Sequence, residues 1–209
     1  MEDNARDNAI LIVGPPGSGK GTQSAHLCTA RPNIVYLESG ALVREWVKQG
    51  SDLAKAYAPQ LDQGVLLDDD QMFAVYKENR ARMASNGDYI PGSSMLLADG
   101  YPRTVGQAIA NTMLDVHGII ELRVDNPHVL VQRIQNDPKR AHRTDNDRET
   151  ILRRIQFYNE KTEPMLDVYA MRGVPIHTYD ASLDLETVQA SVFAAYTSIE
   201  KTMSAASKR

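Results

Sequence analysis

An apolar run followed at once by a glycine-rich loop is the feature of this chain that most restricts its fold. Ala9 to Val13 are all apolar, and the next six residues are Gly14-Pro15-Pro16-Gly17-Ser18-Gly19. A short, uniformly apolar run is typical of a strand buried on both faces, as in a parallel sheet covered by helices. A stretch compatible with a helix, 20–29, follows the loop. The order strand, glycine loop, helix therefore predicts an α/β fold.

The loop has the composition of an anion-binding site. Its three glycines permit backbone conformations that a side chain would hinder, so successive N–H groups can turn towards one ligand. The following helix adds the partial positive charge of its N-terminus, and Lys20 adds a full charge. The general phosphate-binding motif has Ser or Thr directly after the lysine, whereas here Gly21 precedes Thr22. The residues that we predict to bind the phosphates of a nucleotide are Gly17, Ser18, Gly19, Lys20, Gly21 and Thr22.

Strand-like and helix-like segments alternate along the rest of the chain, which indicates one α/β domain of three layers. We expect a central parallel sheet of five strands flanked by helices. The remaining strands are predicted at 33–37, 95–98, 119–124 and 174–178. The remaining helices are predicted at 39–49, from 51 or 52 to about 64, and at 71–84, 104–114, 127–135, 148–171 and 183–201. The three acids at 68–70 are predicted to cap the N-terminus of the helix at 71–84.

Composition excludes several classes of protein. The 209 residues carry a net charge of −4, which gives no overall attraction to nucleic acid or anionic membranes. Cys28 is the single cysteine, so neither an intrachain disulfide nor a cysteine-based zinc site can form. No run approaches the ~20 apolar residues of a membrane helix, and the first residues lack a signal peptide's apolar segment. We therefore expect a cytoplasmic protein with no nucleic-acid or membrane partner.

Three segments together carry a resemblance to a known family. Gly14 to Thr22 resembles the P-loop of adenylate kinases and of the related UMP/CMP kinases. Glu38-Ser39-Gly40-Ala41-Leu42-Val43-Arg44 is similar to the family's Ser-Thr-Gly-Asp-x-x-Arg stretch. Asp99-Gly100-Tyr101-Pro102-Arg103-Thr104, with Gln107, is similar to its Asp-Gly-Phe-Pro-Arg-Thr-x-x-Gln stretch. The segments occur in the family's order, so the resemblance covers nearly the whole chain.

The resemblance implies a P-loop NTPase fold and an acceptor site for AMP. One domain, 1–209, would carry an insertion that binds the monophosphate at about 38–67 and a short lid at about 135–145. Arginine forks can grip a phosphate in a bidentate manner, and a glutamine amide suits the N1/N6 edge of adenine. The residues implied for AMP are Ser39, Gly40, Arg44, Val65, Leu66, Leu67, Gly100, Tyr101, Arg103, Gln107, Arg143 and Arg154.

The same resemblance implies Mg²⁺-dependent phosphoryl transfer, ATP + AMP = 2 ADP, by a monomer. Arg133 would lie over the adenine of ATP, with Leu183 beside it, and Asp99 would orient water around Mg²⁺. The implied catalytic residues are Lys20, Arg103, Arg143 and Arg154. The stretch from Arg133 to Arg143 is short, as in family members without a zinc-bearing lid, so no zinc is expected.

Three positions depart from the family pattern and leave alternatives open. Asp137 stands where a lid arginine is common, Ala41 replaces an acid, and Glu38 replaces a small residue. Because an anion beside a phosphate pocket is unfavourable, we expect Glu38 to point away from it. The alternatives are a UMP/CMP kinase and a catalytically weakened nucleotide-binding homologue. UMP/CMP kinases usually have Asn where Thr104 stands, which favours AMP as the acceptor.

Overall fold

A computed structural model describes residues 6–50, 55–56, 67–138 and 146–206 of the chain. Its centre is a five-stranded sheet in the order β2-β3-β1-β4-β5, and every pair of neighbouring strands is parallel. The strands are β1 (Asp7–Val13), β2 (Ile34–Glu38), β3 (Met95–Asp99), β4 (Leu114–Arg123) and β5 (Ile176–Asp180). The parallel sheet expected from the alternating sequence is therefore confirmed.

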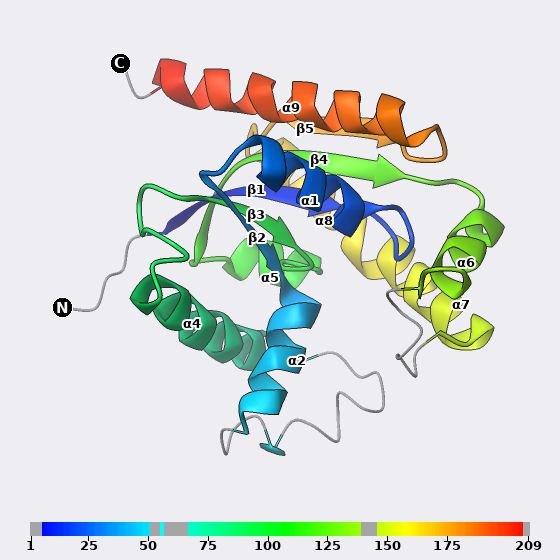
Figure 1. The fold of residues 1–209 in the computed structure, drawn as a ribbon, viewed down its shortest axis with the longest axis horizontal. Coiled ribbons are helices and arrows are strands. Elements are labelled where there is room, and N and C mark those ends of the chain that lie inside the picture. Colours follow the sequence, from blue (N-terminus) through cyan, green and yellow to red (C-terminus); the bar gives the residue numbers. More distant parts are fainter. Residues whose placement is uncertain (1–5, 51–54, 57–66, 139–145, 207–209) are drawn as a thin grey trace.

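Helices cover both faces of the sheet (Figure 1). One face carries α1 (Lys20–Ala30) and α9 (Leu185–Ala206), and the other carries α5 (Val105–Ala110) and α8 (Met165–Met171). Two further pairs lie beyond the sheet's edges in the same view. They are α2 (Ser39–Gln49) with α4 (Asp69–Ser85), and α6 (Pro127–Gln135) with α7 (Arg148–Phe157).

The alternation of side chains along β1 explains the three layers. Ile10 and Ile12 belong to the apolar cluster that includes α1 and α9, whereas Ala9, Leu11 and Val13 belong to the cluster that includes α5 and α8. All five are at most 6% exposed. Successive strand residues point to opposite faces, so only a uniformly apolar strand can serve two cores at once.

Three predicted boundaries were wrong for local reasons. The helix predicted at 104–114 ends at Ala110, because Asn111 turns the chain. Its Oδ1 accepts hydrogen bonds from the backbone N–H groups of Met113 and Leu114, and β4 therefore begins at Leu114 rather than at 119. The helix predicted at 148–171 is divided into α7, a π-helical turn η2 (Tyr158–Thr162) and α8. Pro164, between η2 and α8, lacks the N–H that a continuous helix would need.

A buried carboxylate anchors α4 to the sheet. Asp7, at the start of β1, is 1% exposed and accepts hydrogen bonds from Tyr76 Oη at 2.6 Å and from Arg80 Nε at 2.6 Å. Tyr89 Oη also donates to it. At the other end of α4, Asp68 caps the helix in a reciprocal capping box, which confirms the predicted N-cap. The helix that follows the predicted acceptor insertion is thus fixed at both ends.

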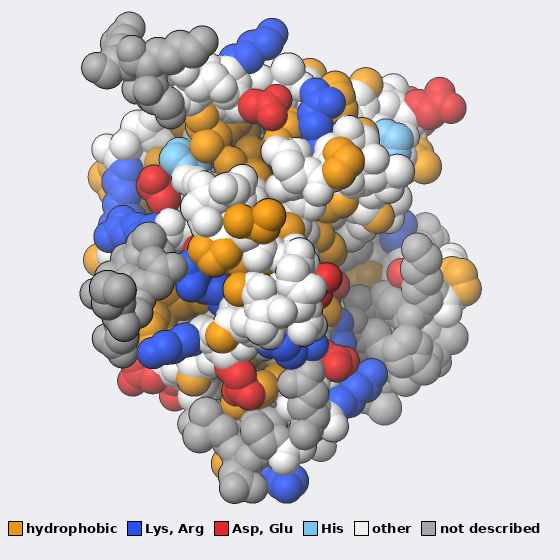
Figure 2. All heavy atoms as spheres, turned by 60° about the vertical axis from the view of Figure 1, so that its left-hand side comes forward, with side chains coloured by type: hydrophobic (Ala, Val, Ile, Leu, Met, Phe, Trp, Pro, Cys, Tyr) orange, Lys and Arg blue, Asp and Glu red, His pale blue; other side chains and the backbone are white. Residues whose placement is uncertain are grey.

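The surface is mixed in character. Figure 2 shows acidic and basic side chains interspersed with apolar ones on the face that it presents. Within the described ranges, none of the helices combines the length and the apolar character needed to cross a bilayer.

Candidate active site at the carboxyl edge of the sheet

The glycine loop begins where β1 ends. Gly17 has φ +83°, and a Cβ built on it would lie 2.8 Å from the backbone oxygen of Leu130. Only glycine fits this combination of left-handed backbone and close approach to α6. The loop also closes on itself through a hydrogen bond of 3.1 Å from the backbone N–H of Ser18 to the oxygen of Pro15. Thr22 lies on the exposed side of the first turn of α1.

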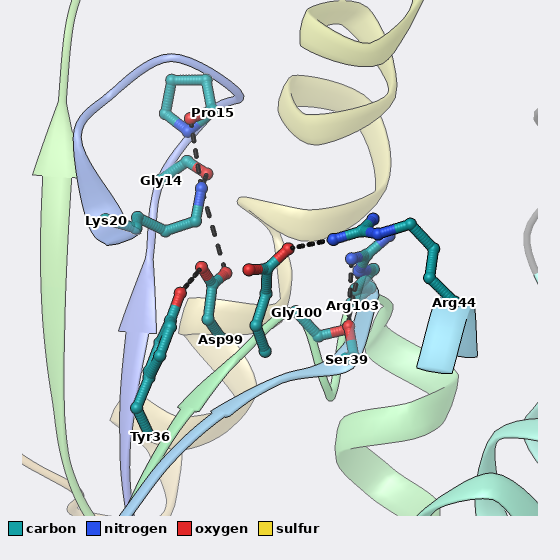
Figure 3. Close-up of polar contacts among 10 residues, drawn as sticks. Gly14, Pro15, Lys20, Tyr36, Ser39, Arg44, Asp99, Gly100 and Arg103 are labelled. Atoms are coloured by element: carbon teal, nitrogen blue, oxygen red, sulfur yellow. Dashed lines mark hydrogen bonds and ion pairs between the residues drawn. The ribbon is translucent and has the colours of Figure 1, made fainter. Parts of the chain in front are cut away.

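Lys20 folds back over this loop. Its Nζ donates to the backbone oxygens of Gly14 at 2.8 Å and of Pro15 at 3.3 Å, and lies 3.9 Å from Asp99 Oδ1 (Figure 3). Burial lowers the pKa of Lys20, and the positive charge of Arg103 lowers it further, while Asp99 raises it. A partly desolvated ammonium group held by neutral carbonyls is well placed to exchange them for an anion.

Asp99, the last residue of β3, is oriented by a residue that sequence reasoning missed. Tyr36 Oη donates to Asp99 Oδ2 at 2.9 Å, while Lys20 faces the other carboxylate oxygen (Figure 3). Burial and the negative charge of Asp99 raise the pKa of Tyr36, so it remains a neutral donor. From the sequence alone, a tyrosine on a strand would be taken for a core residue, and its contact with Asp99 depends on the pairing of β2 with β3. The available signal was that Tyr36 and Glu38, two residues apart on β2, place two polar groups on the same face of the strand.

The site fits a magnesium ion bound with a nucleotide. The side chain of Asp99 is 12% exposed, and its carboxylate lies at the edge of the phosphate-binding loop. Carboxylate oxygens are suitable partners for Mg²⁺ and for the water that it carries, because this ion usually keeps several waters and binds one or two carboxylates. Asp99 is the residue that would serve it here.

Arg103 is held by neutral partners beside Asp99. Its Nε donates to the backbone oxygen of Gly100 at 2.6 Å, and its Nη2 donates to Ser39 Oγ at 3.0 Å (Figure 3). Ser39 Oγ in turn donates to the oxygen of Gly100 at 2.9 Å. The backbone oxygen of Arg103 accepts from Thr162 Oγ1 at 2.8 Å, so the η2 turn also fixes this segment. Arg103 and Ser39, distant in sequence, are brought together as the resemblance implied.

Arg44 is held by an anion, and here one expectation is wrong. Glu38 points towards Arg44 and not away from the pocket, with its Oε1 accepting from Arg44 Nη2 at 3.1 Å (dashed line at Arg44 in Figure 3). The expectation considered only repulsion by a bound phosphate. It left out the attraction of the guanidinium group that lies one and a half turns along α2.

The described residues among those predicted around the acceptor's base lie on α2, α5 and the segments beside them. Gln107, 6% exposed on α5, accepts a hydrogen bond from the backbone N–H of Arg103 with its Oε1 at 2.7 Å, so its amide N–H groups are not used in this bond. Tyr101 and Leu67 are buried, and Leu67 belongs to the apolar cluster that includes Trp46 of α2 and Val75 of α4. Gly40 lies in the first turn of α2. Val65 and Leu66 fall outside the described residues.

The residues predicted over the ATP adenine lie on α6 and the segment after β5, and a further predicted catalytic arginine lies on α7. Arg133 Nη1 donates to the backbone oxygen of Ala181 at 2.8 Å, two residues before Leu183, which is 50% exposed. Arg154, in the last turn of α7, is close enough to Lys20 for its charge to lower the pKa of that lysine. Asp137 follows the end of α6. Arg143 lies outside the described residues.

Comparison with known proteins agrees with this geometry. The family model described as adenylate kinase matches residues 12–174. An adenylate kinase of Stenotrophomonas maltophilia is 33% identical, over 89% of this chain and 97% of that protein. One from Sinorhizobium medicae is 35% identical, over 88% and 96%, and one from Thermus thermophilus is 31% identical, over 79% and 85%. With the motifs, the parallel sheet and both cationic sites in agreement, the chain belongs to the adenylate kinase family.

Proposed function

We propose that this chain catalyses the reversible, Mg²⁺-dependent reaction ATP + AMP = 2 ADP. The observation that carries the proposal is the presence of two cationic sites at one edge of the sheet. Lys20 and the glycine loop form one, and Arg103 with Ser39 and Gly100 forms the other. Asp99 lies in contact range of the first. Burial lowers the pKa of Arg103, and the carboxylate of Asp99 is close enough to offset part of that lowering. Two phosphorylated ligands bound there would face each other.

The proposed chemistry needs positioning and charge rather than a base. A monophosphate oxygen is already ionised near neutral pH and can attack the γ-phosphorus directly. Lys20 would stabilise the transferring group from the donor side, and Arg103, with Arg154 and Arg143, from the acceptor side. Mg²⁺ bound with ATP would neutralise charge on its phosphates. Tyr36 would hold Asp99 in orientation, because its hydroxyl occupies one of the two carboxylate oxygens.

AMP is the proposed acceptor for two reasons. Thr104 stands at the motif position where UMP/CMP kinases usually have Asn, and its Oγ1 accepts the backbone N–H of Gln107 at 3.1 Å. That bond caps the start of α5, and the Gln107 side chain is held by its own bond to the backbone N–H of Arg103. The free amide N–H groups of Gln107 could donate to an unprotonated ring nitrogen such as adenine N1.

Steady-state rates with ATP and each of AMP, UMP, CMP and GMP test the proposal. We expect kcat/KM for AMP to exceed that for the other acceptors by at least tenfold. Fast turnover with UMP or CMP but not AMP would show that the chain is a UMP/CMP kinase and that AMP is not its acceptor. Binding of ATP with no ADP formed from ATP and AMP would instead identify a weakened homologue, the alternative that Asp137 and Ala41 favour. Action as a monomer in the cytoplasm remains a prediction.

A further inference from the structure

We propose that Glu38 competes with the acceptor's phosphate for Arg44, and thereby sets the affinity for the acceptor rather than the rate of transfer. The inference rests on the proposed function, because it takes Arg44 as part of the acceptor site. It concerns a residue at which this chain departs from its family's motif, where a small residue is usual.

The position of Glu38 in the sheet directs its side chain into the site. Glu38 ends β2, and its register partner on the neighbouring strand is Asp99. Side chains two residues apart on a strand share a face, so Glu38 lies on the same face as Tyr36, whose hydroxyl reaches Asp99. The charge of Glu38 also acts across the site. Burial lowers the pKa of both Lys20 and Arg103, and the carboxylate of Glu38 offsets a small part of that lowering.

The two arginines of the acceptor site differ in what they hold. Arg103 donates to a backbone oxygen and a hydroxyl, both neutral, whereas Arg44 donates to a carboxylate. The pair lies over the first turn of α2: a Cβ on Gly40 would be 3.2 Å from Arg44 Nη1 and 3.4 Å from Glu38 Oε1. An incoming phosphate therefore finds Arg103 bonded to weakly competing partners, but finds one donor of Arg44 already bonded to an anion.

Competition should lower the affinity for the acceptor through two effects that add to each other. The phosphate must replace Glu38 on the guanidinium group, and the displaced carboxylate then remains close to a second anion. The side chains of Arg44 and Glu38 are 47% and 37% exposed, so solvent screens their attraction and displacement is feasible. Both effects act on the phosphate alone, so base selectivity should not depend on Glu38.

Two substitutions separate charge from shape. Glu38→Gln keeps the size of the side chain and a hydrogen-bond acceptor for Arg44 but removes the negative charge, and Glu38→Ser introduces a small residue. Glu45→Gln is the matched control, because it removes an equal charge from α2 at an exposed position next to Arg44. Thermal unfolding of each variant verifies that it is folded.

Calorimetric titration with AMP and steady-state kinetics provide the test. We expect Glu38→Gln and Glu38→Ser to lower the Kd and KM for AMP by about three- to fivefold, with kcat within about twofold of the parent. The gain should shrink as salt is raised, and the AMP-to-CMP ratio of kcat/KM should stay constant. Glu45→Gln should change none of these values.

Three results would overturn the inference: an unchanged Kd for AMP in the Glu38 variants, a higher Kd in those variants, or an equal gain in affinity in Glu45→Gln. A higher Kd would mean that Glu38 orients Arg44 for the phosphate. Failure of the proposed function is distinguishable, because in that case the parent protein itself would form no ADP from ATP and AMP, whereas the titration reports AMP binding without turnover.

Discussion

Replacing Gly100 by alanine should damage both the stability of the protein and its acceptor site. Gly100 follows β3 with φ +87°, and an added Cβ would lie 2.4 Å from Ser39 Oγ and 2.5 Å from Arg103 Nη2. These separations are far shorter than van der Waals contact, so both side chains would have to move. Arg103 would then lose its bonds of 2.6 Å to the Gly100 oxygen and 3.0 Å to Ser39 Oγ.

The magnitude follows from these losses. A left-handed backbone costs a residue other than glycine about 1–2 kcal/mol. Hydrogen bonds to a charged group contribute about 1.5–3 kcal/mol each, although water can replace part of this at a half-buried arginine. We therefore expect the free energy of unfolding to fall by about 2–4 kcal/mol. Displacement of Arg103 by about 1 Å should raise the KM for AMP or lower kcat by up to about 100-fold.

Urea unfolding followed by tryptophan fluorescence measures the stability change. Trp46 is the single tryptophan and is 1% exposed, so its emission reports loss of the packing between α2 and α4. Gly106→Ala is the control, because Gly106 lies inside α5 and an added Cβ would meet only Thr104 Oγ1, at 3.8 Å. That control should be stabilised by about 0.5–1 kcal/mol. If Gly100→Ala unfolds at the same urea concentration as the parent and keeps its KM for AMP, the steric reasoning is wrong.

Three further substitutions or conditions test other parts of the site. Lys20→Ala should lower kcat at least about 100-fold while circular dichroism shows the fold retained, and unchanged turnover would remove Lys20 from the mechanism. Tyr36→Phe removes the hydrogen bond to one oxygen of Asp99, so the Mg²⁺ concentration that gives half-maximal rate should rise severalfold with little change in the KM for AMP. An unaltered Mg²⁺ dependence would show that Tyr36 does not orient Asp99. Burial raises the pKa of Tyr101 to about 12, so its contribution to the free energy of unfolding, up to about 2–3 kcal/mol, is complete below pH 10 and is lost as pH rises from about 10 to 12. Tyr101→Phe should therefore make the loss of stability over that window smaller than in the parent, and an equal loss would refute this contribution.

Sequence patterns with a local cause predicted the structure well. The phosphate-binding loop, the five parallel strands and the cap at Asp68 each follow from residues that are neighbours in the chain. An apolar run bounded by turn residues can hardly be anything but a buried strand, and a reciprocal cap is determined by two side chains three residues apart.

Features that depend on strand pairing could not be predicted in the same way. Tyr36 bonds to Asp99 across 63 residues of sequence. The nearby Glu38 indicates that this face of the strand is polar, but it does not identify Asp99 as the partner. The orientation of Glu38 likewise depends on the register of β2 against β3 and on where α2 places Arg44. The break at η2 has a local signal in Pro164, but the π turn itself is stabilised by a tertiary contact from Thr162 to the backbone of Arg103.

Several cationic side chains lie close together at the carboxyl edge of the sheet, although they repel one another. Burial is the main cause of the lowered pKa values of Lys20 and Arg103. Arg103 and Arg154 lower the pKa of Lys20 further, and Arg44 lowers that of Arg103, so these cations also repel one another in the absence of anionic ligands. Phosphates relieve this repulsion when they bind, and the groups that would stabilise the transition state are already in position. Glu38 offsets part of the same repulsion permanently. Its carboxylate therefore stabilises the protein without ligand at the expense of acceptor affinity, which is the trade-off between stability and function expected where like charges are gathered for catalysis.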